Sequence, residues 1–215
     1  MYREILEHNH ITEYGTALLP EKLRPFSELC YAVSFMIPLP KTVVAGIADG
    51  PTPLYFHHYR TINAYLDRVA LEIVLAFTAA GHDAVYIPAS QSIPRGGLAG
   101  ELSHKAAACA AGLGSIGMNA LFLSKTFGPA VRLSTVLTDR ALAQSGADLD
   151  LCTRCGACVE NCPSGALYGV PYHAGIRREE MMDAKKCSEF MKKDSADVGR
   201  GAVCGRCVAA CPLCR

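Results

Sequence analysis

The spacing of the cysteines in the last third of the chain constrains its fold more than any other feature. Nine of the eleven cysteines lie at or beyond residue 152. Their first run reads Cys152-Thr-Arg-Cys155-Gly-Ala-Cys158-Val-Glu-Asn-Cys162-Pro163, which has the spacing C-x2-C-x2-C-x3-C-P. Three thiolates spaced in this way can hold three corners of one iron–sulfur cube, and the fourth cysteine of such a run normally ligates a second cluster. The run therefore predicts two cluster sites.

A second set of cysteines completes both predicted sites. Cys187 stands alone, and further on the chain reads Cys204-Gly-Arg-Cys207-Val-Ala-Ala-Cys211-Pro212. If the fourth cysteine of each run crosses to the other site, Cys211 joins the first three cysteines. The two predicted [4Fe–4S] ligand sets are then Cys152, Cys155, Cys158 and Cys211, and Cys162, Cys187, Cys204 and Cys207.

Other uses of these cysteines remain as alternatives. Paired C-x2-C motifs also bind structural zinc, and cysteines can form a disulfide framework. A zinc site does not call for a third cysteine at the same spacing or for the Cys-Pro that follows, so we expect clusters. Cys30 and Cys109 suit core packing. Cys214 is either an exposed thiol or an alternative ligand to Cys211.

The composition describes a globular chain with little net charge. Half of the 215 residues are hydrophobic and the net charge is +1, so a core is available and no overall field favours nucleic acid. The first ten residues contain carboxylates where a signal peptide needs an apolar stretch, and the longest apolar run, residues 69–81, is too short to span a bilayer. We therefore expect a cytoplasmic protein without a membrane partner, whose thiols stay reduced.

Hydrophobic periodicity predicts an α/β (α+β) domain ahead of the cysteine-rich part. Apolar residues recur at steps of three and four between residues 62 and 77, which predicts an amphipathic helix that ends at Gly81. Residues 1–28 are expected to be helix and loop. The other expected elements are strands at 30–39, 83–88 and 131–138 and a helix at 103–111.

The domain organisation follows from this pattern. Residues 141–151 are rich in Ala, Gly, Ser and Asp, which is typical of a linker. We therefore predict an α/β domain over residues 1–145 and a cluster domain over residues 146–215.

A glycine-rich stretch carries the second candidate site. It reads Gly112-Leu-Gly114-Ser-Ile-Gly117-Met-Asn119, and as G-x-G-x-x-G it imitates a dinucleotide-binding loop, with Asp139 about where a ribose-binding acid falls. A Rossmann loop, however, follows a strand, whereas this one follows an alanine-rich stretch that favours helix. A purely structural turn remains an alternative. We expect instead a large cofactor held close to the backbone, because glycine leaves room for it.

The stretch from Ser103 to Asn119, Ser-His-Lys-Ala-Ala-Ala-Cys-Ala-Ala-Gly-Leu-Gly-Ser-Ile-Gly-Met-Asn, followed by a strand and the paired cysteine motifs, resembles the epoxyqueuosine reductase family and, more distantly, the reductive dehalogenases. The resemblance covers residues 55 to 212. It implies a nitroreductase-like cobalamin-binding domain followed by a ferredoxin-like module with two [4Fe–4S] clusters. The cobalamin-binding residues that it implies are Ser103, His104, Lys105, Gly112, Leu113, Gly114, Gly117 and Asn119.

The resemblance also implies a direction of electron flow. Electrons from a low-potential donor of the ferredoxin or flavodoxin type would pass through the clusters to a base-off cobalamin, which would reduce a small-molecule or protein-bound acceptor. The alternative is a non-catalytic electron carrier or a partner that reduces a corrinoid in another protein.

The chain departs from the family pattern at two positions of possible catalytic importance. Gln91 stands where the family has a general-acid aspartate, and an amide cannot transfer a proton as a carboxylic acid does. Met118 stands where the family has a lysine. The catalytic candidates are Tyr59 and Gln91, with His57, His58 and His104 as further proton donors. Because the chain offers no evident basic groove, we do not expect transfer RNA as a partner.

Overall fold

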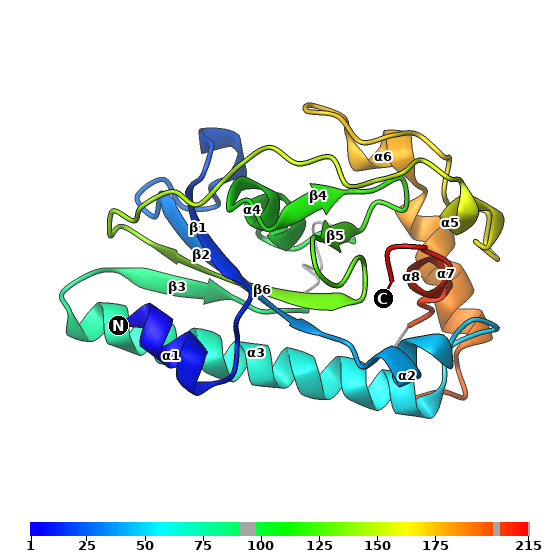
Figure 1. Ribbon diagram of the computed structural model, residues 1–215, viewed down its shortest axis with the longest axis horizontal. Coiled ribbons are helices and arrows are strands. Elements are labelled where there is room, and N and C mark those ends of the chain that lie inside the picture. Colours follow the sequence, from blue (N-terminus) through cyan, green and yellow to red (C-terminus); the bar gives the residue numbers. More distant parts are fainter. Residues whose placement is uncertain (91–97, 200–202, 215) are drawn as a thin grey trace. The chain divides into compact units, whose positions relative to one another are not determined.

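The computed structural model describes residues 1–90, 98–199 and 203–214 (Figure 1). The chain divides into two compact units, each assembled from separate stretches of sequence. Unit 1 comprises Met1–Ile37, Thr61–Gly114 and Arg132–Leu149, and unit 2 comprises Pro38–Arg60, Ser115–Val131 and Asp150–Arg215. The domain boundary expected between residues 145 and 146 stays a prediction.

Unit 1 is built on a sheet whose described strands follow the order β1-β2-β6-β3. The strands are β1 (Tyr14–Leu18), β2 (Tyr31–Pro38), β3 (Ala84–Ile87) and β6 (Val131–Thr138). The pairs β1–β2 and β3–β6 are antiparallel. The expected strands are confirmed, and the mixed α/β class with them. Antiparallel pairing also separates this sheet from the parallel Rossmann sheet.

Helices cover both faces of the sheet. Helix α3 (Pro53–Ala79) and helix α1 (Tyr2–His8) bury apolar side chains against one face, in a core that includes Leu6, Leu66, Val69, Ile73, Phe77, Val33, Phe35 and Val136. Helix α4 (His104–Ala110) contacts β1 on the other face. Val33 of β2 faces the core, and successive side chains of a strand point to opposite faces, so Ser34 faces away from that core. Gly15 pairs with Ser34 and therefore lies on the same face, toward α4.

Strand β1 corrects the expectation of helix and loop over residues 1–28. Helix α1 is present there, but residues 14–18 form a strand and Glu21–Leu23 a short 3₁₀ helix, η1. The sequence of β1, Tyr-Gly-Thr-Ala-Leu, contains glycine and alanine, which have low strand propensity. The glycine is required by packing, because a Cβ atom on Gly15 would lie 2.5 Å from the carbonyl oxygen of Ala111. Tertiary contact, not local preference, decides this strand.

The expected linker is partly ordered along β1. The backbone N–H of Ser145 donates to the carbonyl oxygen of Thr16 at 2.9 Å, and the N–H of Thr16 donates to the Ser145 hydroxyl at 3.1 Å. The Thr16 hydroxyl also donates to the carbonyl of Ala143. Because β1 is at the edge of the sheet, these bonds satisfy backbone groups that would otherwise be open to pairing with another chain.

Unit 2 contains short helices that carry or flank the cysteines (Figure 1). Its described elements are α2 (Lys41–Ala45), α5 (Ala157–Glu160), α6 (Arg178–Met181), α7 (Ala184–Asp194), α8 (Arg206–Ala209) and the paired strands β4 (Gly114–Ile116) and β5 (Phe122–Ser124). Helix α8 contacts both α5 and α2. Within the described ranges, every helix is too short or too polar to cross a membrane.

His104 fastens the first turn of α4 to the sheet of unit 1. Its Nε2 lies 3.0 Å from the carbonyl oxygen of Pro88, and its Nδ1 lies 2.9 Å from the hydroxyl oxygen of Thr135. A carbonyl oxygen can only accept, so Nε2 carries a proton, and the Thr135 hydroxyl can donate to an unprotonated Nδ1. This arrangement suits a neutral ring. Burial lowers the pKa of His104, and the nearby charge of Arg132 acts in the same direction.

We predict that this neutral histidine makes the fold sensitive to acid. Its pKa is lowered in the folded chain, so its contribution to the free energy of unfolding is complete above the unfolded value of about 6.5 and is lost as the pH falls below it. Each pH unit over which only the unfolded chain binds the proton removes about 1.4 kcal/mol. Thermal denaturation of the wild type and of His104→Gln, from about pH 8 to about pH 5.5, measures this loss.

Glutamine keeps a side-chain N–H that can reach Pro88 but cannot titrate, so the thermal midpoint of His104→Gln should fall less with acid. His8→Gln, which removes an exposed histidine, is the matched control and should follow the wild type. Parallel pH profiles for the wild type and His104→Gln would contradict the assignment.

Candidate functional site

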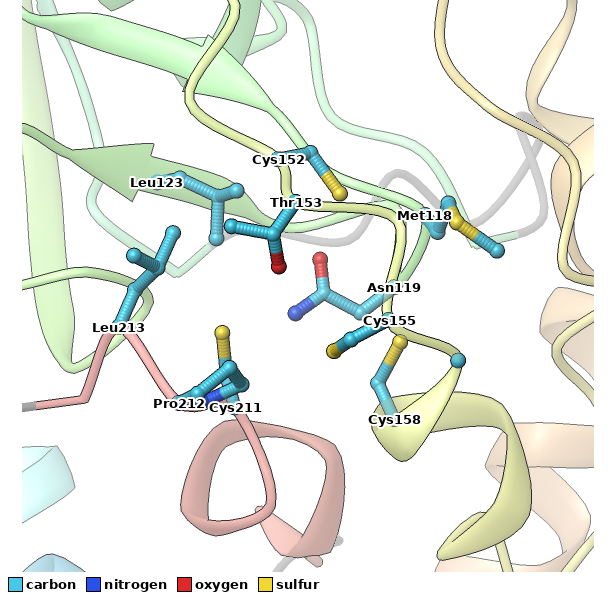
Figure 2. Close-up of a pocket in the computed structure, with 11 residues that line it drawn as sticks. Met118, Asn119, Leu123, Cys152, Thr153, Cys155, Cys158, Cys211, Pro212 and Leu213 are labelled. Atoms are coloured by element: carbon cyan, nitrogen blue, oxygen red, sulfur yellow. The ribbon is translucent and has the colours of Figure 1, made fainter.

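Four of the predicted ligands line one cavity in unit 2 (Figure 2). They are Cys152, Cys155, Cys158 and Cys211. The space among these side chains amounts to about 320 Å³, part of which is open solvent outside the cavity. Its other lining residues are Met118, Asn119, Leu123, Thr153, Gly156, Pro212 and Leu213. In Figure 2 the sulfurs of the four cysteines turn toward this common space, so the structure brings together residues that lie far apart in the sequence.

The two cysteine runs fold in the same local way. Gly156 precedes α5 and Gly205 precedes α8, with left-handed φ angles of 80° and 83°. Each helix begins directly after its glycine and carries the next cysteine of its run, Cys158 or Cys207. A side chain is strained in this backbone region, whereas glycine adopts it freely. The repeated Cys-Gly-x-Cys sequence therefore produces a repeated turn that presents two sulfurs.

Electrostatic proximity separates the thiols into the two predicted sets. Cys158 interacts with Cys152 and Cys211, and Cys211 also interacts with Cys155. In the other set, Cys187 interacts with Cys162 and Cys204. Cys207 interacts with all three of these and also with Cys158. The two sets therefore meet where the contacting helices α5 and α8 carry Cys158 and Cys207.

Burial holds most of these thiols in the protonated form when no metal is bound. It raises the pKa of Cys158, Cys187, Cys204 and Cys211, and it raises that of Cys207 to about 12. Neighbouring thiols act in the same direction, because like charges oppose ionisation. A metal that binds here must displace protons from the sulfurs and compensate several buried negative charges. The positively charged irons of a cluster satisfy that requirement.

Hydrogen bonds at other sulfurs favour the thiolate. The N–H of Ala157 and the hydroxyl of Thr153 lower the pKa of Cys155. At Cys162 burial acts to raise the pKa, but the Ser164 hydroxyl, 3.4 Å from the sulfur, and nearby backbone N–H groups outweigh it and lower the pKa. Donors of this kind also tune the reduction potential of a cluster bound by the same sulfurs.

Apolar side chains enclose the sulfurs where the two sets meet. Met118 and Leu167 are buried against Cys158, and Val159 and Met182 pack around them together with Cys152, Cys162 and Cys207. Such a wall excludes water, so electrostatic effects on a cluster are stronger than in solvent. The cysteine spacing carries no signal for these residues, which come from separate segments.

Hydrogen bonds at both ends of α7 hold two ligands of the second set in place. Cys187 lies in its first turn, which is capped where the Asp183 carboxylate accepts from the N–H of Lys186 at 2.8 Å. At the far end, the buried Ser195 donates its hydroxyl to the carbonyl of Val203 at 2.7 Å, directly before Cys204. These bonds fix two ligands of one set relative to each other.

Two of the predicted cofactor-approaching glycines are covered by the chain itself. At Gly112, where φ is 70°, a Cβ atom would lie 2.8 Å from the backbone nitrogen of Ala147. At Gly117 it would lie 2.8 Å from a methyl carbon of Leu123. These contacts give glycine a packing role at both positions, and the assignment of Gly112 and Gly117 to the cofactor stays a prediction.

The other predicted residues occupy different settings. Ser103 caps α4, accepting from the N–H of Ala106 at 3.3 Å. His104 lies within hydrogen-bond distance of Pro88 and Thr135. Leu113 is buried, and Lys105 and Tyr59 are half-buried. Gly114 begins β4. Tyr59 packs on Tyr55, with 6.4 Å between ring centroids, and Gln91 lies outside the described residues. Among the predicted cofactor-binding residues that the structure describes, Asn119 is the one that lines the cysteine cavity.

Comparison with known protein families identifies the cysteine-rich part. Residues 151–213 match the family described as "4Fe-4S double cluster binding domain". This match confirms two [4Fe–4S] clusters as the cofactors of this part of the chain.

Curated relatives include an epoxyqueuosine reductase from Listeria monocytogenes, 32% identical over 125 residues, which cover 54% of this chain and 31% of the relative. A tetrachloroethene reductive dehalogenase from Desulfitobacterium hafniense is 28% identical over 117 residues, covering 47% of this chain and 20% of that protein. The chain therefore spans about a third or less of the length of these relatives.

Solved structures share the fold. A reductive dehalogenase whose structure suggests a mechanism for B12-dependent dehalogenation superposes with a TM-score of 0.77 at 18% identity, covering 100% of this chain and 31% of that chain. An epoxyqueuosine reductase from Streptococcus thermophilus superposes with a TM-score of 0.58 at 15% identity, covering 99% and 65%. The resemblance to these two groups of reductases is thereby confirmed.

Substitution of single cysteines tests the two ligand sets. We expect Cys155→Ala and Cys211→Ala to lose one cluster and Cys162→Ala and Cys204→Ala to lose the other, because each removes one of four thiolates. Iron content should fall from about eight to about four atoms per chain in each variant. Electron paramagnetic resonance (EPR) spectra should distinguish the two groups of variants. Cys214→Ala is the control and should retain both clusters. Loss of the same cluster in Cys211→Ala and Cys162→Ala would contradict crossed ligation.

The paired turns provide a second, graded test. A Cβ atom at Gly205 would lie 2.5 Å from Ile47 Cδ1, whereas at Gly156 the nearest atom is Glu160 Oε1 at 3.8 Å. Gly156→Ala should therefore cost about 1–2 kcal/mol of backbone strain, and Gly205→Ala a further 1–3 kcal/mol, roughly, from overpacking. Thermal denaturation of the iron-loaded protein measures both. Equal destabilisation would show that packing at Gly205 relaxes without cost.

Proposed function

We propose that this relative of the epoxyqueuosine reductases and reductive dehalogenases is an iron–sulfur reductase. Electrons from an external low-potential donor of the ferredoxin or flavodoxin type would pass through two [4Fe–4S] clusters to a bound cobalamin, for the reduction of a substrate. The cavity lined by Cys152, Cys155, Cys158 and Cys211 is the observation that carries the proposal, because it gathers one complete ligand set in one place.

The ligands proposed for the two clusters are the two sets described above. The first is held by Cys152, Cys155, Cys158 and Cys211, and the second by Cys162, Cys187, Cys204 and Cys207. Thiolate-ligated clusters reach potentials low enough for difficult one-electron reductions. The contact between α5 and α8 supports an electron path from one set to the other through the region of Cys158 and Cys207.

The protein's own contribution at the first cluster is binding, exclusion of water and stabilisation of charge. Met118, Leu123 and Leu213 provide apolar wall, which lowers the local dielectric and strengthens nearby hydrogen bonds. The N–H of Ala157 and the hydroxyl of Thr153 are directed at Cys155. In this proposal residues 146–215 form the ferredoxin-like module, and residues 1–145 form the nitroreductase-like domain.

The proposed cobalamin is supported by the relatives, among them the dehalogenase described as B12-dependent. When bound, it would supply a metal centre that can be driven to a low oxidation state. The assignments of Ser103, His104, Lys105, Gly112, Leu113, Gly114, Gly117 and Asn119 to that cofactor, and of Tyr59 and Gln91 to catalysis, stay predictions.

The relatives suggest two classes of acceptor. One epoxyqueuosine reductase has been solved with a modified transfer RNA stem loop, and one dehalogenase with 3-bromo-4-hydroxybenzoic acid. We propose a small-molecule acceptor, because a net charge of +1 provides little overall attraction for nucleic acid. A transfer RNA acceptor is the second candidate.

Anaerobic reconstitution with iron, sulfide and cobalamin tests the proposal. We expect about eight irons per chain, one bound corrinoid by ultraviolet–visible absorption, and the EPR signal of a base-off cobalamin. Cys204→Ala is the control, since it should block electron delivery while retaining the corrinoid. About eight irons without any corrinoid would contradict the cobalamin-dependent reductase and favour an electron carrier.

A further inference from the structure

Asn119 is a buried amide in the wall of the first cysteine cavity. Its side chain is 4% exposed, and its Oδ1 accepts a hydrogen bond from the backbone N–H of Leu121 at 3.1 Å. That bond fixes which end of the amide is the oxygen, because an N–H needs an acceptor. The Nδ2 end therefore points away from Leu121, among the labelled cysteine sulfurs in Figure 2.

The turn that carries Asn119 holds this orientation firmly. The N–H of Gly117 donates to the carbonyl of Leu121 at 3.0 Å, and the N–H of Ala120 donates to the carbonyl of Gly117 at 2.8 Å. Ala120 itself has a left-handed φ of 55°, which costs an L-residue about 1–2 kcal/mol. The strained turn therefore persists with the amide aimed into the cavity.

The amide nitrogen has no hydrogen-bond acceptor among residues 1–90, 98–199 and 203–214, and it is not one of the fully buried unpaired side-chain atoms of these residues. Nδ2 therefore keeps contact with the space of the cavity that Asn119 lines. A polar group in such a position normally finds a hydrogen-bond partner. The acceptors that this cavity can offer are thiolate and sulfide sulfurs of a bound cluster, which carry negative charge.

We propose that the Asn119 side-chain amide donates a hydrogen bond to a sulfur of the cluster held by Cys152, Cys155, Cys158 and Cys211, and thereby raises the reduction potential of that cluster. Reduction adds one electron and breaks no bond. Because the reduced cluster is the more negative form, a donor stabilises it more than the oxidised form. Asn119 would thus set the potential at which an electron enters or leaves this cluster.

A purely structural role makes a different prediction. If Asn119 serves only to accept from Leu121, then loss of its N–H donor should leave the potential unchanged, and any shift in Asn119→Asp should come from the added charge alone. Asn119→Asp keeps that oxygen, loses the N–H donor and adds charge. Asn119→Ala loses the donor without adding charge, so the two variants together separate the hydrogen bond from the charge.

The test is a redox titration of the iron-loaded protein monitored by EPR. At a fixed potential we expect the ratio of reduced to oxidised first cluster to fall about tenfold in Asn119→Ala, equivalent to about 59 mV for one electron, and further in Asn119→Asp. The second cluster, an internal control, should move less. Asn161→Asp makes the same chemical change on an exposed amide whose Nδ2 donates to Ala157 at 2.9 Å, and should also move less.

A measurement on the wild type makes the test independent of folding in the variants. Side-chain ¹⁵N-labelled asparagine should give a ¹⁵N coupling to the reduced first cluster in pulsed EPR. Absence of the coupling, an unmoved midpoint in both Asn119 variants, or a lowered midpoint in Asn119→Asp alone would overturn the proposal.

This inference rests on the proposed ligation, and iron analysis separates the two. Survival of the first cluster in Cys211→Ala would contradict the proposed ligation. A full complement of iron with an unmoved midpoint in the Asn119 variants would contradict only the role of Asn119.

Discussion

The constraint on which unit 2 depends is the cost of gathering buried thiols that must become thiolates. Burial raises the pKa of Cys207 to about 12, and neighbouring sulfurs oppose ionisation further. The protein offsets part of this cost with N–H and O–H donors at Cys155 and Cys162. The rest requires positive metal charge, so binding of the clusters contributes to the stability of the fold that binds them. Capped turns, short helices and the Ser195–Val203 bond hold the sulfurs ready for that event.

Unit 1 depends on a different balance of forces. Its core is apolar, with Leu66, Ile73 and Phe77 of α3 fully buried against the sheet, so hydrophobic burial supplies most of its stabilisation. Buried polar side chains in this unit include the pair of His104 and Thr135 and the unpaired hydroxyl of Ser134. A metal-dependent unit and a core-dependent unit therefore share one chain.

Much of this could be predicted from sequence because the signals are local. Cysteine spacing specifies which sulfurs one loop can present, and the pattern over residues 62–77 specifies a helix. Strand β1 could not be predicted, since Gly15 is selected by its contact with Ala111. The glycine-rich stretch illustrates the same limit: the atoms that require glycine at residue 112 belong to residues 145–147. The direction of the Asn119 amide could not be predicted either, because it is set by the hydrogen bond from the N–H of Leu121 within the folded turn.

Iron anomalous diffraction from anaerobic crystals of the iron-loaded protein would show directly which sulfurs hold the iron. We expect two four-iron centres, one bounded by the sulfurs of Cys152, Cys155, Cys158 and Cys211 and the other by those of Cys162, Cys187, Cys204 and Cys207. A centre ligated by the whole first run, with Cys162 in place of Cys211, would contradict crossed ligation. A single metal ion at either site would contradict a four-iron centre there.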